Sequence, residues 1–145
     1  MPANIQPIFP LTPKIGYTGN LTTANTNKDG TGVINLLFSA GENGAKIDQI
    51  KVRARGTNVA TVMRFFVNNG ADPSVAANNT LVHETTIAAT TLSEVAALAD
   101  NDITITKESE VVSPIPYLPP NHRIYVTIGT AVAAGLQATC WGGDY

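Results

Sequence analysis

The sequence predicts an all-β protein: an antiparallel two-sheet β-sandwich, jelly-roll-like, with an extended proline-rich N-terminal arm. Three features of the 145 residues support this fold class. Short stretches of alternating apolar and polar residues recur along the chain, and turn residues separate them roughly every eight to twelve positions. No helical pattern is long enough for a crossover, which excludes parallel βαβ folds. We expect one sandwich domain at residues 15–145, preceded by the arm at residues 1–14.

The longest β-favouring run, residues 58–69, predicts a central strand. Alternate side chains of a strand share one face, so we expect the odd-numbered set to face the core: Val59, Thr61, Met63, Phe65 and Val67. The opposite set carries a charge and is expected to be only partly covered: Ala60, Val62, Arg64 and Phe66. An Asn-Asn-Gly sequence at residues 68–70 ends the run with residues that suit turns.

The arm is predicted from four prolines within residues 1–14. Proline fixes φ and removes a hydrogen-bond donor, which excludes a helix and disfavours a central strand. A tail surrounded by water would not need the apolar residues of this segment, which we take as partner-binding candidates: Ile5, Ile8, Phe9 and Leu11. The arm is expected to lie along a surface, either that of its own domain or that of a neighbouring molecule.

Further strands are predicted over residues 15–23, 81–88, 102–107, 122–129 and 136–141. Each shows period-two alternation between turn-rich segments. In the last of them, Leu136, Ala138 and Cys140 are expected to point inward. Cys140 is therefore interpreted as a buried, inert thiol.

Trp141 has the opposite parity to Cys140 and is followed closely by the terminal Tyr145. We predict that these two aromatic residues form a partner-binding patch. The alternative is that the proline-rich arm covers them.

A hairpin is predicted from residues 33–39 and 47–55, because a five-residue loop with two glycines connects them. The second of these strands places Lys51, Arg53 and Arg55 on its polar face, either in water or against an acidic partner. Residues 111–118 contain two prolines of the same parity, which is typical of an edge strand or a bulge. The Thr-x-x-Glu spacing that begins at Thr91 is typical of a capping box and predicts a short helical turn over residues 91–98.

The amino-acid composition disfavours several classes of function. Only 14% of the residues are charged and the formal net charge is −2, which disfavours electrostatic binding of nucleic acid or an anionic membrane. We expect no signal peptide and no membrane span, since no apolar run approaches about 20 residues. Low charge combined with 43% hydrophobic residues is compatible with a protein that buries much of its surface in an assembly.

No catalytic motif is found, so we predict no enzymatic activity, no catalytic residue, no metal site and no cofactor. His83 and Glu84 are neighbours in a predicted strand and should point to opposite faces. Four carboxylates near one strand are interpreted as a solvated acidic rim: Asp100, Asp102, Glu108 and Glu110. A polar sugar pocket remains an alternative for a set of loop residues: Asn68, Asn69, Asp72, Asn78 and Asn79.

Three stretches carry a resemblance that spans most of the chain: residues 60–70 (ATVMRFFVNNG), the Leu118-Pro119-Pro120 turn, and residues 128–145 (IGTAVAAGLQATCWGGDY). They are similar to small virion proteins of tailed bacteriophages and prophages, some of which resemble the jelly-roll decoration (cement) proteins that coat capsids. The resemblance implies a structural protein, often a homotrimer, that binds the major capsid protein at subunit junctions and stabilises the shell.

The same resemblance implies a location in the virion, after assembly in the host cytoplasm, and it supplies no catalytic residue. An apolar arm and a low charge would also suit another part of the particle. The alternative function is therefore a tail, fibre or receptor- or carbohydrate-binding component of a phage.

Overall fold

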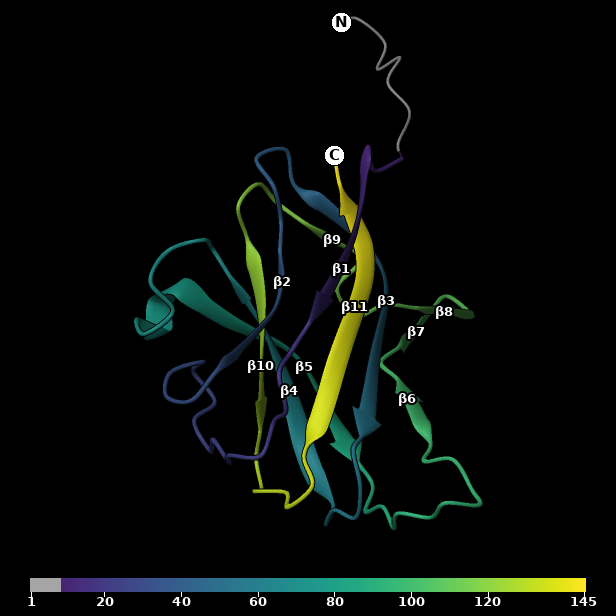
Figure 1. The fold of residues 1–145 in the computed structure, drawn as a ribbon. Coiled ribbons are helices and arrows are strands. Elements are labelled where there is room, and N and C mark those ends of the chain that lie inside the picture. Colours follow the sequence, from purple (N-terminus) through teal and green to yellow (C-terminus); the bar gives the residue numbers. More distant parts are fainter. Residues whose placement is uncertain (1–8) are drawn as a thin grey trace, which may run out of the picture.

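The computed structural model describes residues 9–145, which form an all-β fold with antiparallel sheets that do not close into a barrel (Figure 1). The first sheet has the order β1-β11-β3-β6, with β9 also paired to β3. Its strands are β1 (Thr12–Tyr17), β11 (Leu136–Asp144), β3 (Ala45–Ala54), β6 (Asp100–Asp102) and β9 (Tyr117–Leu118). The second sheet has the order β2-β10-β4-β5. Its strands are β2 (Asn35–Ser39), β10 (Arg123–Ile128), β4 (Thr61–Asn68) and β5 (Asn79–Ile87).

The eight main strands pair as nested antiparallel partners. β1 pairs with β11, β2 with β10, β3 with β6, and β4 with β5. The first and last strands of the described residues are therefore adjacent, and Figure 1 shows β1 running beside β11. Two further strands, β7 (Ile105–Lys107) and β8 (Glu110–Val112), form a separate ribbon at the side of the body. The 3-10 turn η1 (Ala76–Asn78) is the helical element of the described residues.

One hydrophobic core receives side chains from both large sheets. Fully buried residues of the first sheet include Ile50, Val52, Ala138 and Cys140. The second sheet contributes Met63, Phe65, Ile124 and Val126. Burial of a Val, Ile, Met or Phe side chain contributes about 1.5–3 kcal/mol each, so this shared cluster is the main source of stability. The inward parity predicted for Leu136, Ala138 and Cys140 is confirmed.

The predicted central strand is present as β4, but its burial differs from the period-two expectation. Met63 and Phe65 are buried as predicted, whereas Val59 is 58% exposed because the strand begins only at Thr61. Phe66 is also fully buried, and the pairing of β4 with β5 shifts register between Phe65 and Phe66. The face of β4 that carries Phe66, which was expected to be only partly covered, is therefore also covered by other parts of the protein.

The segment at residues 25–30, between β1 and β2, explains why both faces of β4 are buried. Asn25 donates its backbone N–H to the Ile128 carbonyl, and its own carbonyl accepts a bond from Arg64. Further along, the Asn79 side chain donates to the Gly30 carbonyl. These contacts carry residues 25–30 across the outer face of β10, β4 and β5. Arg64 and Phe66, which were expected to be only partly covered, are consequently buried, and so is Thr127 of β10.

The predicted hairpin between residues 33–39 and 47–55 is wrong. A tight turn, in which the Gly44 N–H donates to the Gly41 carbonyl, sends the chain from β2 in the second sheet to β3 in the first. The alternation of β2 also fails, since Leu37 and Phe38 are both buried and Leu36 is exposed. An irregularity in the pairing of β2 with β10 accompanies this change.

The predicted helical turn over residues 91–98 is also wrong, because this stretch is irregular in the structure. The Ser93 hydroxyl accepts a hydrogen bond from the Val95 N–H, and such local bonds compete with helix formation. Val95 is 97% exposed and only Leu98 of this stretch packs against the core, which is too little burial to stabilise a short helix.

Three strand boundaries also differ from the sequence expectation. The strand predicted over residues 102–107 is divided between β6 and β7, with Ile103 buried between them. The proline-interrupted stretch 111–118 contributes β8 and β9. The first strand begins at Thr12 instead of residue 15, and Leu21 contacts β11 only through an isolated bridge to Leu136.

Asn58 joins three segments of the fold, because its backbone bridges Thr90 and its side chain bonds the loop before β11, and it provides a stability test. Its buried side chain donates to the Gly135 carbonyl at 2.8 Å and accepts the N–H groups of Ala134 at 2.8 Å and Gly135 at 3.1 Å. We expect Asn58→Ala to lower the free energy of unfolding by about 2–3 kcal/mol, because buried backbone groups lose their partners. Urea denaturation followed by far-UV circular dichroism measures this change.

The matched control is Asn43→Ala. Asn43 lies in an exposed turn and makes one long side-chain bond, of 3.3 Å, to the Tyr145 carbonyl. Its replacement should change the free energy of unfolding by less than about 0.5 kcal/mol. Equal effects of the two variants would contradict the role assigned to Asn58.

Candidate partner-binding surface

Strand β1 and the residues just before it present exposed apolar side chains, here called the β1 stripe: Phe9, Leu11, Pro13, Ile15 and Tyr17. Phe9 and Tyr17 are each 73% exposed, Leu11 is 75% exposed and Ile15 is 56% exposed. Pro13, Ile15 and Tyr17 alternate along β1 and share one face, whereas Phe9 and Leu11 lie at bends just before the strand. Large apolar side chains that lie exposed along one short segment are a signature of an interaction surface.

The even-numbered residues of β1 hold the strand against the body. The Lys14 ammonium lies 5.2 Å from the centre of the Phe38 ring, forms an ion pair with Asp144 at 3.1 Å, and donates to the Ser39 carbonyl. A methyl group at Gly16 would overlap the Leu37 carbonyl oxygen, so this position requires glycine. The inward face of β1 is thus fixed, which turns the β1 stripe outward.

β1 is also an edge strand, since β11 is its one partner among the described strands. The Thr18 N–H donates to the Ala138 carbonyl, and backbone groups alternate in direction along an antiparallel strand. The even-numbered residues of β1 therefore bond to β11, and Pro13, Ile15 and Tyr17 direct their backbone groups to the open edge. The Leu11 N–H, just before the strand, instead donates to the Asp144 carbonyl. Pro13 is one of the residues whose backbone faces the open edge, so its lack of an N–H costs no hydrogen bond to β11.

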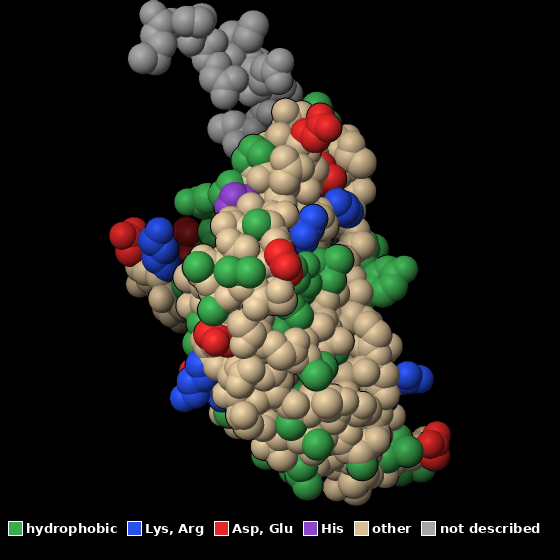
Figure 2. Space-filling view, turned by 90° about the vertical axis from the view of Figure 1, so that its left-hand side faces the viewer, with side chains coloured by type: hydrophobic (Ala, Val, Ile, Leu, Met, Phe, Trp, Pro, Cys, Tyr) green, Lys and Arg blue, Asp and Glu red, His purple; other side chains and the backbone are tan. Residues whose placement is uncertain are grey.

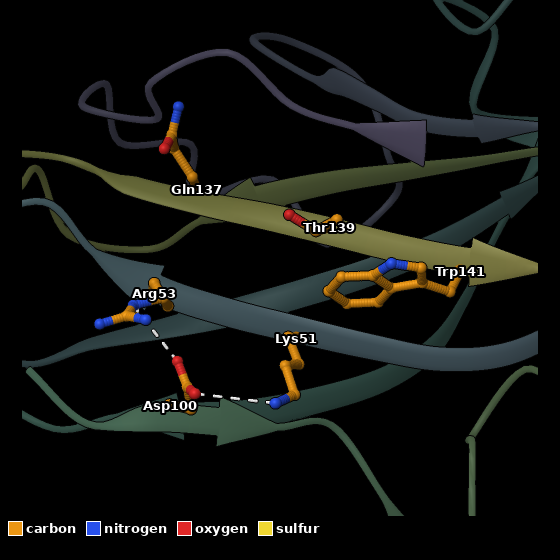
Figure 3. A pocket seen from close by; sticks show the side chains of 6 residues that line it. All are labelled: Lys51, Arg53, Asp100, Gln137, Thr139 and Trp141. Atoms are coloured by element: carbon orange, nitrogen blue, oxygen red, sulfur yellow. Dashed lines mark ion pairs between the residues drawn. The ribbon is translucent and has the colours of Figure 1, made fainter. Parts of the chain in front are cut away.

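A hollow of about 290 Å³ lies beside β1 on the outer face of the first sheet. We call it the Trp141 hollow, and six residues line it: Lys51, Arg53, Asp100, Gln137, Thr139 and Trp141. Figure 3 shows the last three on β11, the two cations on β3 and Asp100 on β6. The register places Ile15 directly opposite Trp141, and Tyr17 opposite Thr139. The β1 stripe and the Trp141 hollow are consequently adjacent.

Charges in the hollow are paired within the chain. Asp100 forms ion pairs with Arg53 at 3.2 Å and with Lys51 at 3.6 Å (Figure 3). Asp102 lies 3.8 Å from Lys51. Two of the three cations predicted to face water or an acidic partner, Lys51 and Arg53, are therefore brought together with two carboxylates of the predicted acidic rim by the pairing of β3 with β6. Figure 2 shows a different face, on which charged side chains are few and scattered.

The partner-binding candidates from the sequence fall into four groups. Phe9 and Leu11 lie in the β1 stripe, while Ile5 and Ile8 lie outside the described residues. Trp141 lines the hollow, but Tyr145 is separate and donates its N–H to the Gly44 carbonyl. Among the described arm residues, Leu11 donates its backbone N–H to the Asp144 carbonyl.

The sequence analysis did not select Ile15 and Tyr17. Both were assigned to a strand of the domain, and Phe9 and Leu11 to the arm. The detectable signal was the shared odd parity from Phe9 to Tyr17, which continues across the expected boundary at residue 14.

The other polar candidates have structural partners. Glu84 pairs with Arg64 at 2.6 Å, whereas the His83 ring lies 6.1 Å from the Phe65 ring and has its pKa lowered by burial. The loop asparagines proposed for a sugar pocket mostly bond one another and the loop backbone, as between Asn68 and Asn79 at 2.9 Å. Across residues 9–145, no group of three or more His, Cys, Asp or Glu residues is placed to hold a metal ion.

Comparisons with protein-family models, with curated proteins and with solved structures found no match for this chain. Within the described part of the chain, no helix has the length and hydrophobicity needed to cross a membrane.

The buried thiol gives a chemical test of the core beneath the hollow. Burial, reinforced by the charge of Asp48, raises the pKa of Cys140 to about 12. A pKa this far above pH 8 leaves roughly one thiol in ten thousand ionised. We expect no reaction of the native protein with Ellman's reagent at pH 8 and stoichiometric reaction in guanidinium chloride. Rapid labelling of the native protein would contradict the packing of β11.

Proposed function

We propose that this chain is a non-enzymatic structural protein of a bacteriophage virion, a decoration (cement) protein that binds the major capsid protein at subunit junctions and stabilises the shell. The observation that carries the proposal is the β1 stripe, an apolar row on an open sheet edge. The row continues toward an N-terminal segment that carries further apolar residues, Ile5 and Ile8.

The strand order supports a jelly-roll sandwich as the body of this protein. When the eight main strands are numbered along the chain, the antiparallel pairs are first with eighth, second with seventh, third with sixth and fourth with fifth. Alternate pairs belong to the two large sheets. This is the order expected when one long hairpin is wrapped into two facing sheets. Jelly rolls occur in capsid proteins and in lectins, so the function is argued from the surface.

The proposed mechanism is burial of the β1 stripe and the arm against the shell. Each fully buried aliphatic or aromatic side chain contributes about 1.5–3 kcal/mol before ordering costs. The open edge of β1 can add backbone hydrogen bonds with an extended segment of the partner. A homotrimer would repeat these contacts three times, and such multivalency turns modest contacts into strong attachment. Low net charge is compatible with this mainly apolar binding.

A tail, fibre or carbohydrate-binding role is the second candidate. The Trp141 hollow favours it, since an aromatic side chain beside polar ones is suited to a soluble ligand. Copy number separates the two locations: many copies per particle indicate the shell, and few indicate the tail.

The double variant Phe9→Ser with Leu11→Ser tests the proposal without disturbing the core. Both side chains are largely exposed, so the fold should persist. The affinity for capsids should fall by about tenfold or more. Co-sedimentation with capsids assembled without this protein measures the bound fraction. Val95→Ser, which alters an apolar residue of even greater exposure in a separate loop, should leave binding unchanged.

Two outcomes would reject the proposal at different levels. Full binding by a folded double variant would reject the β1 stripe as the contact. Absence of capsid binding by the unaltered protein, or its recovery only in tail fractions, would reject the decoration role itself.

A further inference from the structure

We propose that the Trp141 hollow binds a neutral saccharide. This goes beyond attachment to a capsid, because it assigns a small-molecule site to the outer face of β11, β3 and β6. It also places any saccharide on a different surface from the asparagine-rich loop considered from the sequence.

The hollow has the size of a small ligand site. Its volume of about 290 Å³ lies near the lower end of ligand pockets, which span about 300–1,000 Å³. Space of this kind suits one or two sugar rings. Because the hollow is formed by paired strands of the first sheet, its residues are held by a continuous ladder, and little ordering is needed on binding.

Trp141 supplies the apolar platform. It is partly exposed, and Figure 3 shows its indole extending from β11 on the side of the sheet where Lys51 also lies. The C–H bonds of a pyranose ring make weak favourable contacts with the face of an aromatic ring. Tyr17 stands opposite Thr139 in the register, and its exposed ring extends the aromatic surface toward β1.

Polar groups around the indole match sugar hydroxyls. Gln137 supplies both amide donors and an acceptor, and Thr139 supplies a hydroxyl. Arg53 and Asp100 lie 3.2 Å apart, so one hydroxyl can accept from the guanidinium while a neighbouring hydroxyl donates to the carboxylate. A vicinal diol presents both functions at this spacing, unlike a phosphate, which only accepts.

The charge balance selects a neutral ligand. Lys51 and Arg53 are matched by Asp100 and Asp102 within 3.8 Å, so the formal charge of the four groups sums to zero. An anionic sugar would have to break these pairs or approach a carboxylate. A cationic ligand would face two ammonium or guanidinium groups that are already engaged.

Trp141 is the single tryptophan of the chain, so its fluorescence reports on the hollow directly. We would titrate the intact protein with methyl glycosides and neutral disaccharides of glucose, galactose, mannose and N-acetylglucosamine. We expect a saturable shift in emission with a dissociation constant on the order of 1 mM. N-acetyltryptophanamide serves as the control for effects of the sugar on solvent. Sialyllactose and a heparin tetrasaccharide test the anionic alternative.

Variants that keep the indole locate the site. Gln137→Ala and Thr139→Ala should each weaken binding about threefold to tenfold, because each removes hydrogen bonds to the ligand. Thr86→Ala, an exposed threonine of β5 in the other sheet, should leave affinity unchanged. Trp141→Phe, measured by calorimetry, should weaken binding further, and circular dichroism checks the fold of each variant.

The proposal is overturned if no neutral sugar binds at about ten times that concentration, if only anionic sugars bind, or if Gln137→Ala and Thr139→Ala bind as tightly as the unaltered protein. Capsid co-sedimentation is scored separately. Saccharide binding can therefore fail while the decoration role stands, and the reverse can also occur.

Discussion

The pairing of β1 with β11 is the constraint on which the rest of the structure depends. It joins the beginning of the described chain to its end, through registered pairs from Thr12 with Asp144 to Tyr17 with Thr139. Gly16 permits close approach to β2, and the Lys14–Asp144 ion pair anchors the open end. Because one face of β1 is fixed in this way, its opposite face must present whatever side chains the alternation supplies. Those side chains are apolar.

Edge strands in soluble proteins are usually protected from further pairing by charges, prolines or bulges. Of these devices, the outward face of β1 has only Pro13, while Ile15 and Tyr17 remain exposed on an open backbone edge. Elsewhere the chain covers the outer face of its second sheet with the segment that contains Asn25 and Gly30. Within residues 9–145 the fold covers the outer face of one sheet and leaves this apolar edge exposed, which supports the proposal that a partner molecule binds there.

Local pattern predicted the all-β class and the inward set on β11, because period-two burial depends only on neighbouring residues. Local pattern could not assign strands to sheets. The alternation before and after the Gly41–Gly44 turn is the same whether β2 and β3 pair in one sheet or lie in different sheets. Nor could it join Lys51 to Asp100, since that contact follows from the pairing of β3 with β6 across nearly fifty residues. Burial on both sides of β4 was missed for a similar reason, as the covering segment comes from a distant part of the sequence.

The candidate surface illustrates the same limit. Phe9, Leu11 and Trp141 could be selected from residue type and parity, whereas the adjacency of Ile15 and Trp141 appears only once β1 is registered on β11. That adjacency links the two proposed roles physically. A partner that covers Ile15 would come into contact with the edge of the Trp141 hollow and would add a wall to it. Saccharide affinity should then differ between free and attached protein, because the same indole borders both surfaces.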